Sequence, residues 1–206
     1  MWGQELLALP SVTNLCLFVK DDIVPSFFKL LQQGFMVRAQ VGCSIKALLC
    51  EQLGVSPEYL EERIQTIFLD GRPVDDLNSA NVKDGSTLAF SAAVPGLAGA
   101  TLRKGGFYAP MRSQISYREV MTSKPLQEGM VLLKLFNLLL RDLGPSFLKR
   151  GVWINGKDLS DFFERQPDDF WAGCHMAQLG GKDLDVAELL EVKWPDREVF
   201  LQVRVV

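Results

Sequence analysis

The strongest constraint on the fold is an internal repeat, in which two similar segments lie 120 residues apart. The segment Asp22–Lys29 reads DIVPSFFK, and the segment Asp142–Lys149 reads DLGPSFLK. Five of the eight aligned positions are identical, and two others exchange one apolar residue for another. A chain of 206 residues that contains the same unit twice predicts two small domains rather than one large domain.

The pattern that follows each octapeptide also repeats. A short apolar run of strand type, 35–41 in the first copy and 152–154 in the second, precedes an apolar stripe with helical spacing. Ser44 and Asp158 stand where each of these helices would begin, and both residue types are good N-caps. We therefore expect a strand followed by a capped helix in both copies.

The end of each copy carries the same turn spacing. Fourteen residues separate a proline from a turn glycine in both copies, Pro57 from Gly71 and Pro167 from Gly181. Asp-Gly and Gly-Gly after a short apolar run are typical of hairpin turns. With opening strands at 12–19 and 130–136, each copy reads as strand, short helix, strand, helix and a late set of strands. This order predicts the α+β class, with a β-grasp sheet and a helix on one face in each copy.

The first copy also resembles a known superfamily. The residues that carry the resemblance are Ile67–Val74, which read IFLDGRPV, and Val82–Phe90, which read VKDGSTLAF. They are similar to the ubiquitin-like β-grasp superfamily, and most of all to the small sulfur carriers of molybdopterin and thiamin synthesis. The resemblance covers 12–96 and, more weakly, 130–206. It implies two tandem β-grasp domains, 1–96 and 126–206, joined by a linker rich in glycine, alanine and basic residues at 97–125.

The chain departs from the sulfur-carrier pattern at the residues that would carry sulfur. A carrier ends in a flexible Gly-Gly whose carboxylate becomes a thiocarboxylate, but here the second glycine position is Leu97 and the chain continues. The second copy ends at Val206 without glycine. Carrier chemistry would therefore require cleavage after Gly106, in the later sequence LRKGG. That cleavage remains the alternative to a linker without carrier function.

The linker is the strongest candidate for a binding segment. The range 96–125 contains five basic residues and one acidic residue, Glu119, and aromatic residues stand among the bases. Such a segment suits an acidic partner, whereas a plain connector would pack its aromatic residues between the two domains. The candidate partner-binding residues are Pro95, Gly96, Arg103, Lys104, Gly105, Gly106, Phe107 and Tyr108.

Composition argues against several other functions. The net charge of −3 gives no basic footprint for nucleic acid, and no apolar run is long enough to cross a bilayer. Four cysteines without a CxxC pair and a single histidine, His175, do not make a zinc site, and we expect no metal or cofactor. Cys174 and His175 are adjacent and would point to opposite faces of a strand, which argues against a catalytic pair. The N-terminus has no basic region of a signal peptide, so we expect a cytoplasmic protein.

Together these observations favour a non-enzymatic protein-binding or scaffold module. A link to sulfur-transfer or molybdenum/tungsten cofactor machinery is implied by the resemblance alone. The partner would be another protein of unknown identity. A homodimer formed by pairing of exposed edge strands is a further alternative, which the sequence does not decide.

Overall fold

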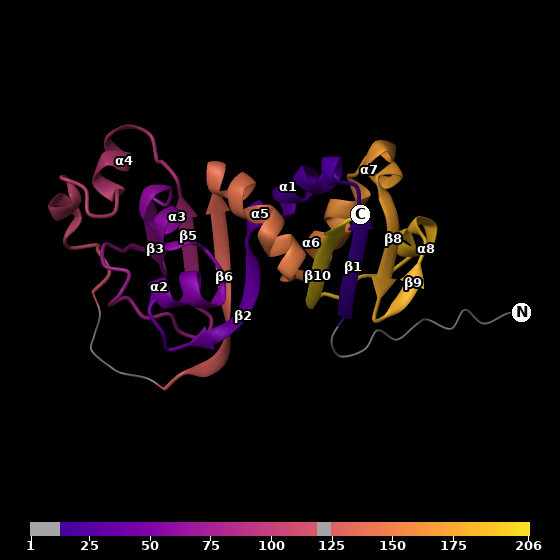
Figure 1. Ribbon diagram of the computed structural model, residues 1–206, viewed down its shortest axis with the longest axis horizontal. Helices are drawn as coiled ribbons and strands as arrows, with labels where there is room; N and C mark the ends of the chain where they lie inside the picture. Colours follow the sequence, from indigo (N-terminus) through magenta and orange to yellow (C-terminus); the bar gives the residue numbers. More distant parts are fainter. Residues whose placement is uncertain (1–12, 119–124) are drawn as a thin grey trace, which may run out of the picture. The chain divides into compact units, whose positions relative to one another are not determined.

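The structure is a computed structural model of mixed α/β class that describes residues 13–118 and 125–206. It separates into two compact units, and Figure 1 labels most of their helices and strands. Unit 2 is the continuous range Leu31–Gly144, whereas unit 1 combines Met1–Leu30 with Pro145–Val206. This division differs from the contiguous ranges 1–96 and 126–206 expected from the sequence, because the chain passes between the units twice.

Unit 2 contains a mixed sheet with the strand order β4-β3-β5-β6-β2. The strands are β2 (Phe35–Val41), β3 (Thr66–Leu69), β4 (Arg72–Pro73), β5 (Thr87–Ser91) and β6 (Gln127–Phe136). β5 and β6 run parallel in the middle of this sheet, and the other neighbouring pairs are antiparallel. The helical segments between β2 and β3 are α2 (Ile45–Ala47), η2 (Leu48–Gln52) and α3 (Pro57–Glu62).

Unit 1 contains a sheet with the corresponding order β9-β8-β1-β10-β7. The strands are β1 (Thr13–Val19), β7 (Val152–Asn155), β8 (Cys174–Leu179), β9 (Lys182–Leu184) and β10 (Glu198–Val205). β1 and β10 run parallel in the middle, and the outer pairs are antiparallel. The helices between β7 and β10 are α6 (Gly156–Glu164), α7 (Asp168–Ala172) and α8 (Val186–Leu190).

The opening strands of the two sequence copies join opposite units. β1 pairs with β8 and β10 from the end of the chain, whereas β6 pairs with β2 and β5 from its first half. The chain passes between the units through η1 (Asp21–Phe27) and α1 (Phe28–Gln33), and again through α5 (Leu138–Arg150). These helical segments contain the repeated octapeptide, so the repeat marks the two passages.

Alternation of apolar residues explains how the sheets bury one face. Val131, Leu133 and Leu135 of β6 are buried, while the residues between them are partly exposed. In unit 1, Phe27 of η1 packs with Phe162 and Phe170 at ring-centroid distances of 5.2 and 5.4 Å. An aromatic cluster from three helical segments thus forms part of the core of unit 1.

Several local predictions can be checked directly. Ser44 caps α2, because its side chain accepts a hydrogen bond from the backbone N–H of Ala47. The turns Asp70-Gly71 and Gly180-Gly181 have positive φ at both residues, as the hairpin prediction requires. The prediction of Asp158 as an N-cap is wrong: the cap of α6 is Asn155, whose side chain accepts from the N–H of Lys157. Asp158 instead lies in the first helical turn.

Candidate protein-binding site on residues 96–118

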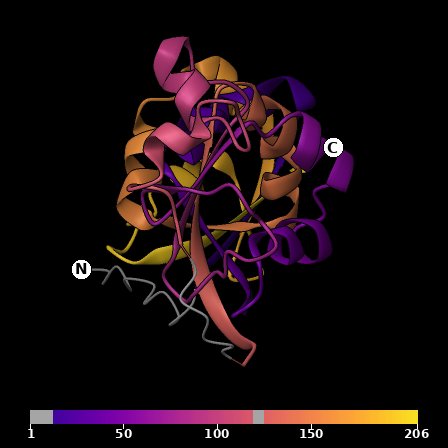
Figure 2. The same cartoon turned by 90° about the vertical axis from the view of Figure 1, so that its left-hand side faces the viewer.

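The segment from Gly96 to Arg118 is folded, although the sequence suggested a linker. It contains α4 (Gly96–Leu102) and η3 (Ala109–Arg112), and Figure 2 shows its helical turns in pink. Backbone hydrogen bonds tie it to the rest of unit 2, from Lys104 N–H to the carbonyl of Gln65 and from Tyr117 N–H to the carbonyl of Pro73. The last part of the expected linker includes 119–124, which lie outside the described residues.

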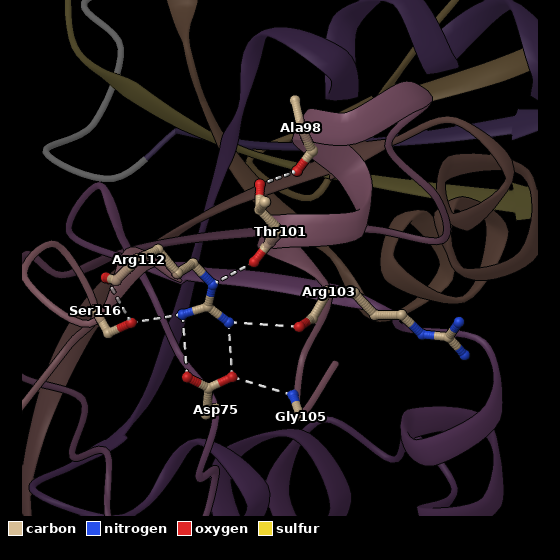
Figure 3. A network of polar contacts seen from close by, with 7 residues as sticks. All are labelled: Asp75, Ala98, Thr101, Arg103, Gly105, Arg112 and Ser116. Carbon is tan, nitrogen blue, oxygen red and sulfur yellow. Dashed lines mark hydrogen bonds and ion pairs between the residues drawn. The ribbon is translucent and has the colours of Figure 1, made fainter. Parts of the chain in front are cut away.

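Arg112 is the main side-chain anchor of this segment (Figure 3). Its side chain is only 4% exposed and forms a two-pronged ion pair with Asp75, with N–O distances of 2.6 and 3.0 Å. Its remaining N–H groups donate to the carbonyls of Thr101 and Arg103 and to Oγ of Ser116. Every donor direction of the guanidinium therefore has an acceptor, which is the condition for burying this charge.

The diglycine Gly105-Gly106 forms part of the same network. The N–H of Gly105 donates to Oδ1 of Asp75 over 3.0 Å, and the N–H of Gly106 donates to the carbonyl of Arg103. The carbonyl of Gly106 accepts from Ala109. Gly105 has φ of +60°, a conformation that glycine adopts without a steric penalty. The two glycines are thus held in a turn in which both of their N–H groups and the Gly106 carbonyl are paired.

A hollow of about 790 Å³ opens beside this turn. One wall is formed by the end of α3 and the residues after it, and the other by the 96–118 segment. Lys104 crosses between the walls, because its Nζ donates to the carbonyl of Leu60 and lies 3.2 Å from a carboxylate oxygen of Glu61. The lining residues are Glu61, Glu62, Gln65, Ala100, Arg103, Lys104, Gly105, Gly106, Phe107 and Tyr108.

Large apolar side chains of this segment stand exposed, and two of them, Phe107 and Tyr108, line the hollow. Phe107 is 89% exposed, Met111 74%, Ile115 58% and Tyr108 42%. We call these four residues the apolar patch. The rings of Phe107 and Tyr108 meet edge to face, with centroids 5.1 Å apart. Because Arg112 anchors the same turns, the patch is exposed on a segment that is held in place.

The structure groups most of the residues selected from the sequence, but not all. Arg103, Lys104, Gly105, Gly106, Phe107 and Tyr108 line one hollow. Pro95 and Gly96 are exposed at the start of α4 and do not line it. Sequence reasoning missed Met111, in the short helix η3, and Ile115, in the turn after it. It also missed Asp75, whose pairing with Arg112 spans 37 residues and leaves no local signal.

The four basic residues of the segment differ in how far they are neutralised. Arg112 is paired with Asp75, and Lys104 is paired with Glu61. The side chain of Arg103 points away from the network in Figure 3, and within the described ranges its guanidinium makes no hydrogen bond or ion pair. Arg118 is exposed and donates to the carbonyl of Ser113. The segment contains no acidic residue, so its free charge is positive.

Other kinds of site were also sought. The residues that the structure describes contain no group of three or more histidine, cysteine or acidic side chains placed to hold a metal ion. In the same parts of the chain, no helix has both the length and the apolar character needed to cross a membrane. Cys174 is buried and the adjacent His175 is exposed, as the alternation of a strand predicts. Burial raises the pKa of the Cys174 thiol, which favours the protonated form.

Comparison with known proteins finds no matching family model, no matching curated protein and no matching solved structure.

Proposed function

We propose that this protein is a non-enzymatic protein-binding module that presents the apolar patch to a partner protein. The supporting observation is that four large apolar side chains, 42–89% exposed, project from a segment fixed by a buried and fully paired arginine. Exposed apolar clusters of this kind are common at binding surfaces, where aromatic and methionine side chains contribute much of the affinity. Binding is favoured over catalysis because the buried Arg112 guanidinium and its acceptors are already hydrogen-bonded to one another, which leaves none of these groups to act on a substrate.

The proposal includes a β-grasp fold for both units. In each sheet a parallel pair lies in the middle and a short hairpin lies at one edge. In each unit a helix connects the opposite edge strand to that hairpin, with η2 after β2 and α6 after β7. A link to sulfur-transfer or molybdenum/tungsten cofactor machinery remains part of the proposal on the basis of the sequence resemblance.

The alternative is a sulfur carrier released by cleavage after Gly106. A protease would need an extended segment at this point, but the backbone groups of Gly105 and Gly106 are held by Asp75, Arg103 and Ala109. Cleavage would therefore require the turn to open first. For this reason we place the carrier second to the binding module.

Photo-crosslinking tests the binding proposal. A photoreactive phenylalanine analogue at position 107, in the protein expressed in its own host, should capture a defined partner. The same analogue at Leu190, which is 52% exposed on α8, serves as a matched control and should not capture it. With the partner purified, replacement of Phe107 and Met111 by serine should weaken binding more than tenfold, the loss expected for two central apolar contacts. Unchanged affinity of that double variant would contradict the proposal.

An intact-mass spectrum of the same native material tests the alternative. A full-length chain as the only species agrees with the binding module. A fragment ending at Gly106, above all one with sulfur in place of a terminal oxygen, would establish the carrier.

A further inference from the structure

The charge beside the apolar patch indicates what kind of partner it suits, and this inference rests on the proposed function. Arg103 and the aromatic pair Phe107 and Tyr108 line the same hollow. Among the described residues, the Arg103 guanidinium has no partner, whereas the neighbouring bases Lys104 and Arg112 are neutralised within the protein. An exposed arginine next to aromatic side chains suits a carboxylate, which it can bind through two parallel hydrogen bonds.

The backbone of the patch restricts how a partner can bind. The N–H groups of Met111, Ser113 and Ile115 all donate to carbonyls three residues earlier. A partner strand could pair only with a row of free backbone N–H and C=O groups. The N–H groups of Met111, Ser113 and Ile115 are already used within the segment, so they offer no such row. A partner that satisfies its own backbone hydrogen bonds, namely a helix, meets this restriction.

The shape of the surface favours a peptide over a lipid bilayer. Phe107 and Tyr108 of the patch line a hollow of about 790 Å³, and Glu62 stands exposed on its opposite wall. A flat bilayer would leave such a hollow unfilled. Side chains of a helix can enter a hollow, with apolar residues three or four positions apart along one face.

We propose that the apolar patch binds an amphipathic helix that carries an aspartate or glutamate at the edge of its apolar face, placed to pair with Arg103. The apolar face covers Phe107, Tyr108, Met111 and Ile115, and the acidic residue fixes the direction of the helix on the surface. Apolar contact supplies most of the affinity, while the charge pair supplies selectivity.

Peptide display on the full chain tests this proposal. A library of peptides of about 16 residues, roughly four helical turns, is selected on the wild-type protein. Counter-selection uses the Phe107→Ser/Met111→Ser double variant. We expect the selected peptides to carry apolar residues at helical spacing with an adjacent acidic residue. Proline in the middle of a selected peptide should abolish binding, since it breaks a helix.

A charge exchange provides the sharper test. Replacing the acidic residue of a selected peptide by lysine should weaken binding to wild type about tenfold, and Arg103→Glu should weaken binding of the original peptide similarly. The lysine peptide should regain affinity for the Arg103→Glu variant. Glu62→Gln, on the opposite wall, is the matched control and should not weaken binding. Thermal unfolding of the Arg103→Glu variant should match wild type within about 1 °C, because the replaced side chain is exposed.

The outcomes separate this inference from the proposed function. Peptides that need the patch but show no acidic preference, or that are not rescued by the charge exchange, would overturn the acidic-helix proposal alone. If no peptide survives counter-selection, the acidic-helix proposal fails, and the proposed function is then decided by the photo-crosslinking at position 107 alone. Binding to vesicles of phosphatidylcholine with about one-third phosphatidylserine, lost in the Phe107→Ser variant, would replace the helix by a membrane surface.

Discussion

Replacement of Arg112 by methionine should release the 96–118 segment while leaving the sheet of unit 2 folded. Methionine keeps much of the aliphatic length but removes the charge and all donors. Asp75 then loses its ion pair, and the acceptors on Thr101, Arg103 and Ser116 lose their donors. The expected result is local opening, because the lost contacts lie within the segment or join it to Asp75, and none of them reaches a strand of the unit 2 sheet.

The size of the effect follows from the burial of the pair. Removing one partner of a buried ion pair typically costs about 3–5 kcal/mol. Asp75 has a side chain that is 39% exposed, so water can solvate the carboxylate once the guanidinium of Arg112 is gone. We therefore expect a cost of about 2–3 kcal/mol, lower than for a fully buried pair. If opening is fast, this corresponds to about 30- to 150-fold faster amide exchange.

Hydrogen exchange measured by mass spectrometry checks this value. The backbone amides of Lys104, Gly105 and Tyr117 should lose protection in the Arg112→Met variant, and the amides of β6 should keep theirs. Arg103→Met is the matched control, since it makes the same change at an exposed arginine whose guanidinium has no partner within the described ranges. Exchange of the segment within about threefold of wild type in Arg112→Met would refute the role assigned to this arginine.

Three further predictions concern unit 1. Burial first, and the nearby Asp158 carboxylate second, raise the pKa of Glu198, so its ionised form destabilises the fold. Glu198→Gln should therefore raise Tm by about 1–2 °C at pH 7. The difference should disappear as pH falls below about 4, where Glu198 is protonated in both the folded and the unfolded state. A pH-independent difference would exclude titration as its cause. Gly151→Ala should lower the free energy of unfolding, measured in urea, by about 2–4 kcal/mol. The reason is that φ of Gly151 is +101° and an added Cβ would lie 2.1 Å from the Phe200 ring. A loss below about 1 kcal/mol would contradict that packing. Asn155→Ala should cost about 1 kcal/mol through the lost cap of α6, whereas an unchanged urea midpoint would show that the cap contributes little.

Features set by neighbouring residues could be predicted from the sequence. The turns at Asp70-Gly71 and Gly180-Gly181 require positive φ, and their residue types show this directly. Ser44 was recognisable as a cap because a cap bonds to an N–H only three residues away. The Asp158 error has the same origin: Asn155 and Asp158 are both good caps, and the sequence does not show where the first helical turn begins.

The candidate site was only partly predictable, because its anchor depends on contacts between distant residues. Composition identified the basic and aromatic character of the segment that contains Arg103 and Phe107. It did not separate the buried Arg112 from the exposed Arg103, since both look alike in a sequence. Burial of Arg112 depends on Asp75, which precedes it by 37 residues. The distinction matters functionally, because one arginine holds the segment and the other is available to a ligand.

The exchange of the opening strands, in which β1 joins unit 1 and β6 joins unit 2, was not predictable for a different reason. β1 and β6 both have alternating buried residues, and both lie in the middle of a sheet beside a parallel strand. Either strand could fill either position as far as its own pattern shows. Which unit each strand joins is decided by its pairing with strands distant in the sequence, which its own pattern does not show.

Fragments of the chain test this exchange directly. The range 31–144 contains all five strands of the unit 2 sheet, so it should fold alone, with dispersed amide resonances and a cooperative urea transition. The fragment 1–96 lacks β6, which lies between β5 and β2 in the middle of that sheet. Without β6, β2 loses its seven-residue pairing with 127–133, and β5 loses its parallel neighbour. The sheet that remains would be a three-stranded β4-β3-β5 fragment with an exposed apolar edge.

We therefore expect fragment 1–96 to be unfolded or aggregated under conditions in which 31–144 is monomeric and folded. The alternative is that β1 takes the position of β6 in the isolated fragment, because its apolar alternation is compatible with either sheet. Native-like resonances for β2 and β5 in fragment 1–96 would show this substitution. They would mean that the exchange is a preference of the full chain, set by competition between two similar strands, and not a requirement of the unit 2 sheet.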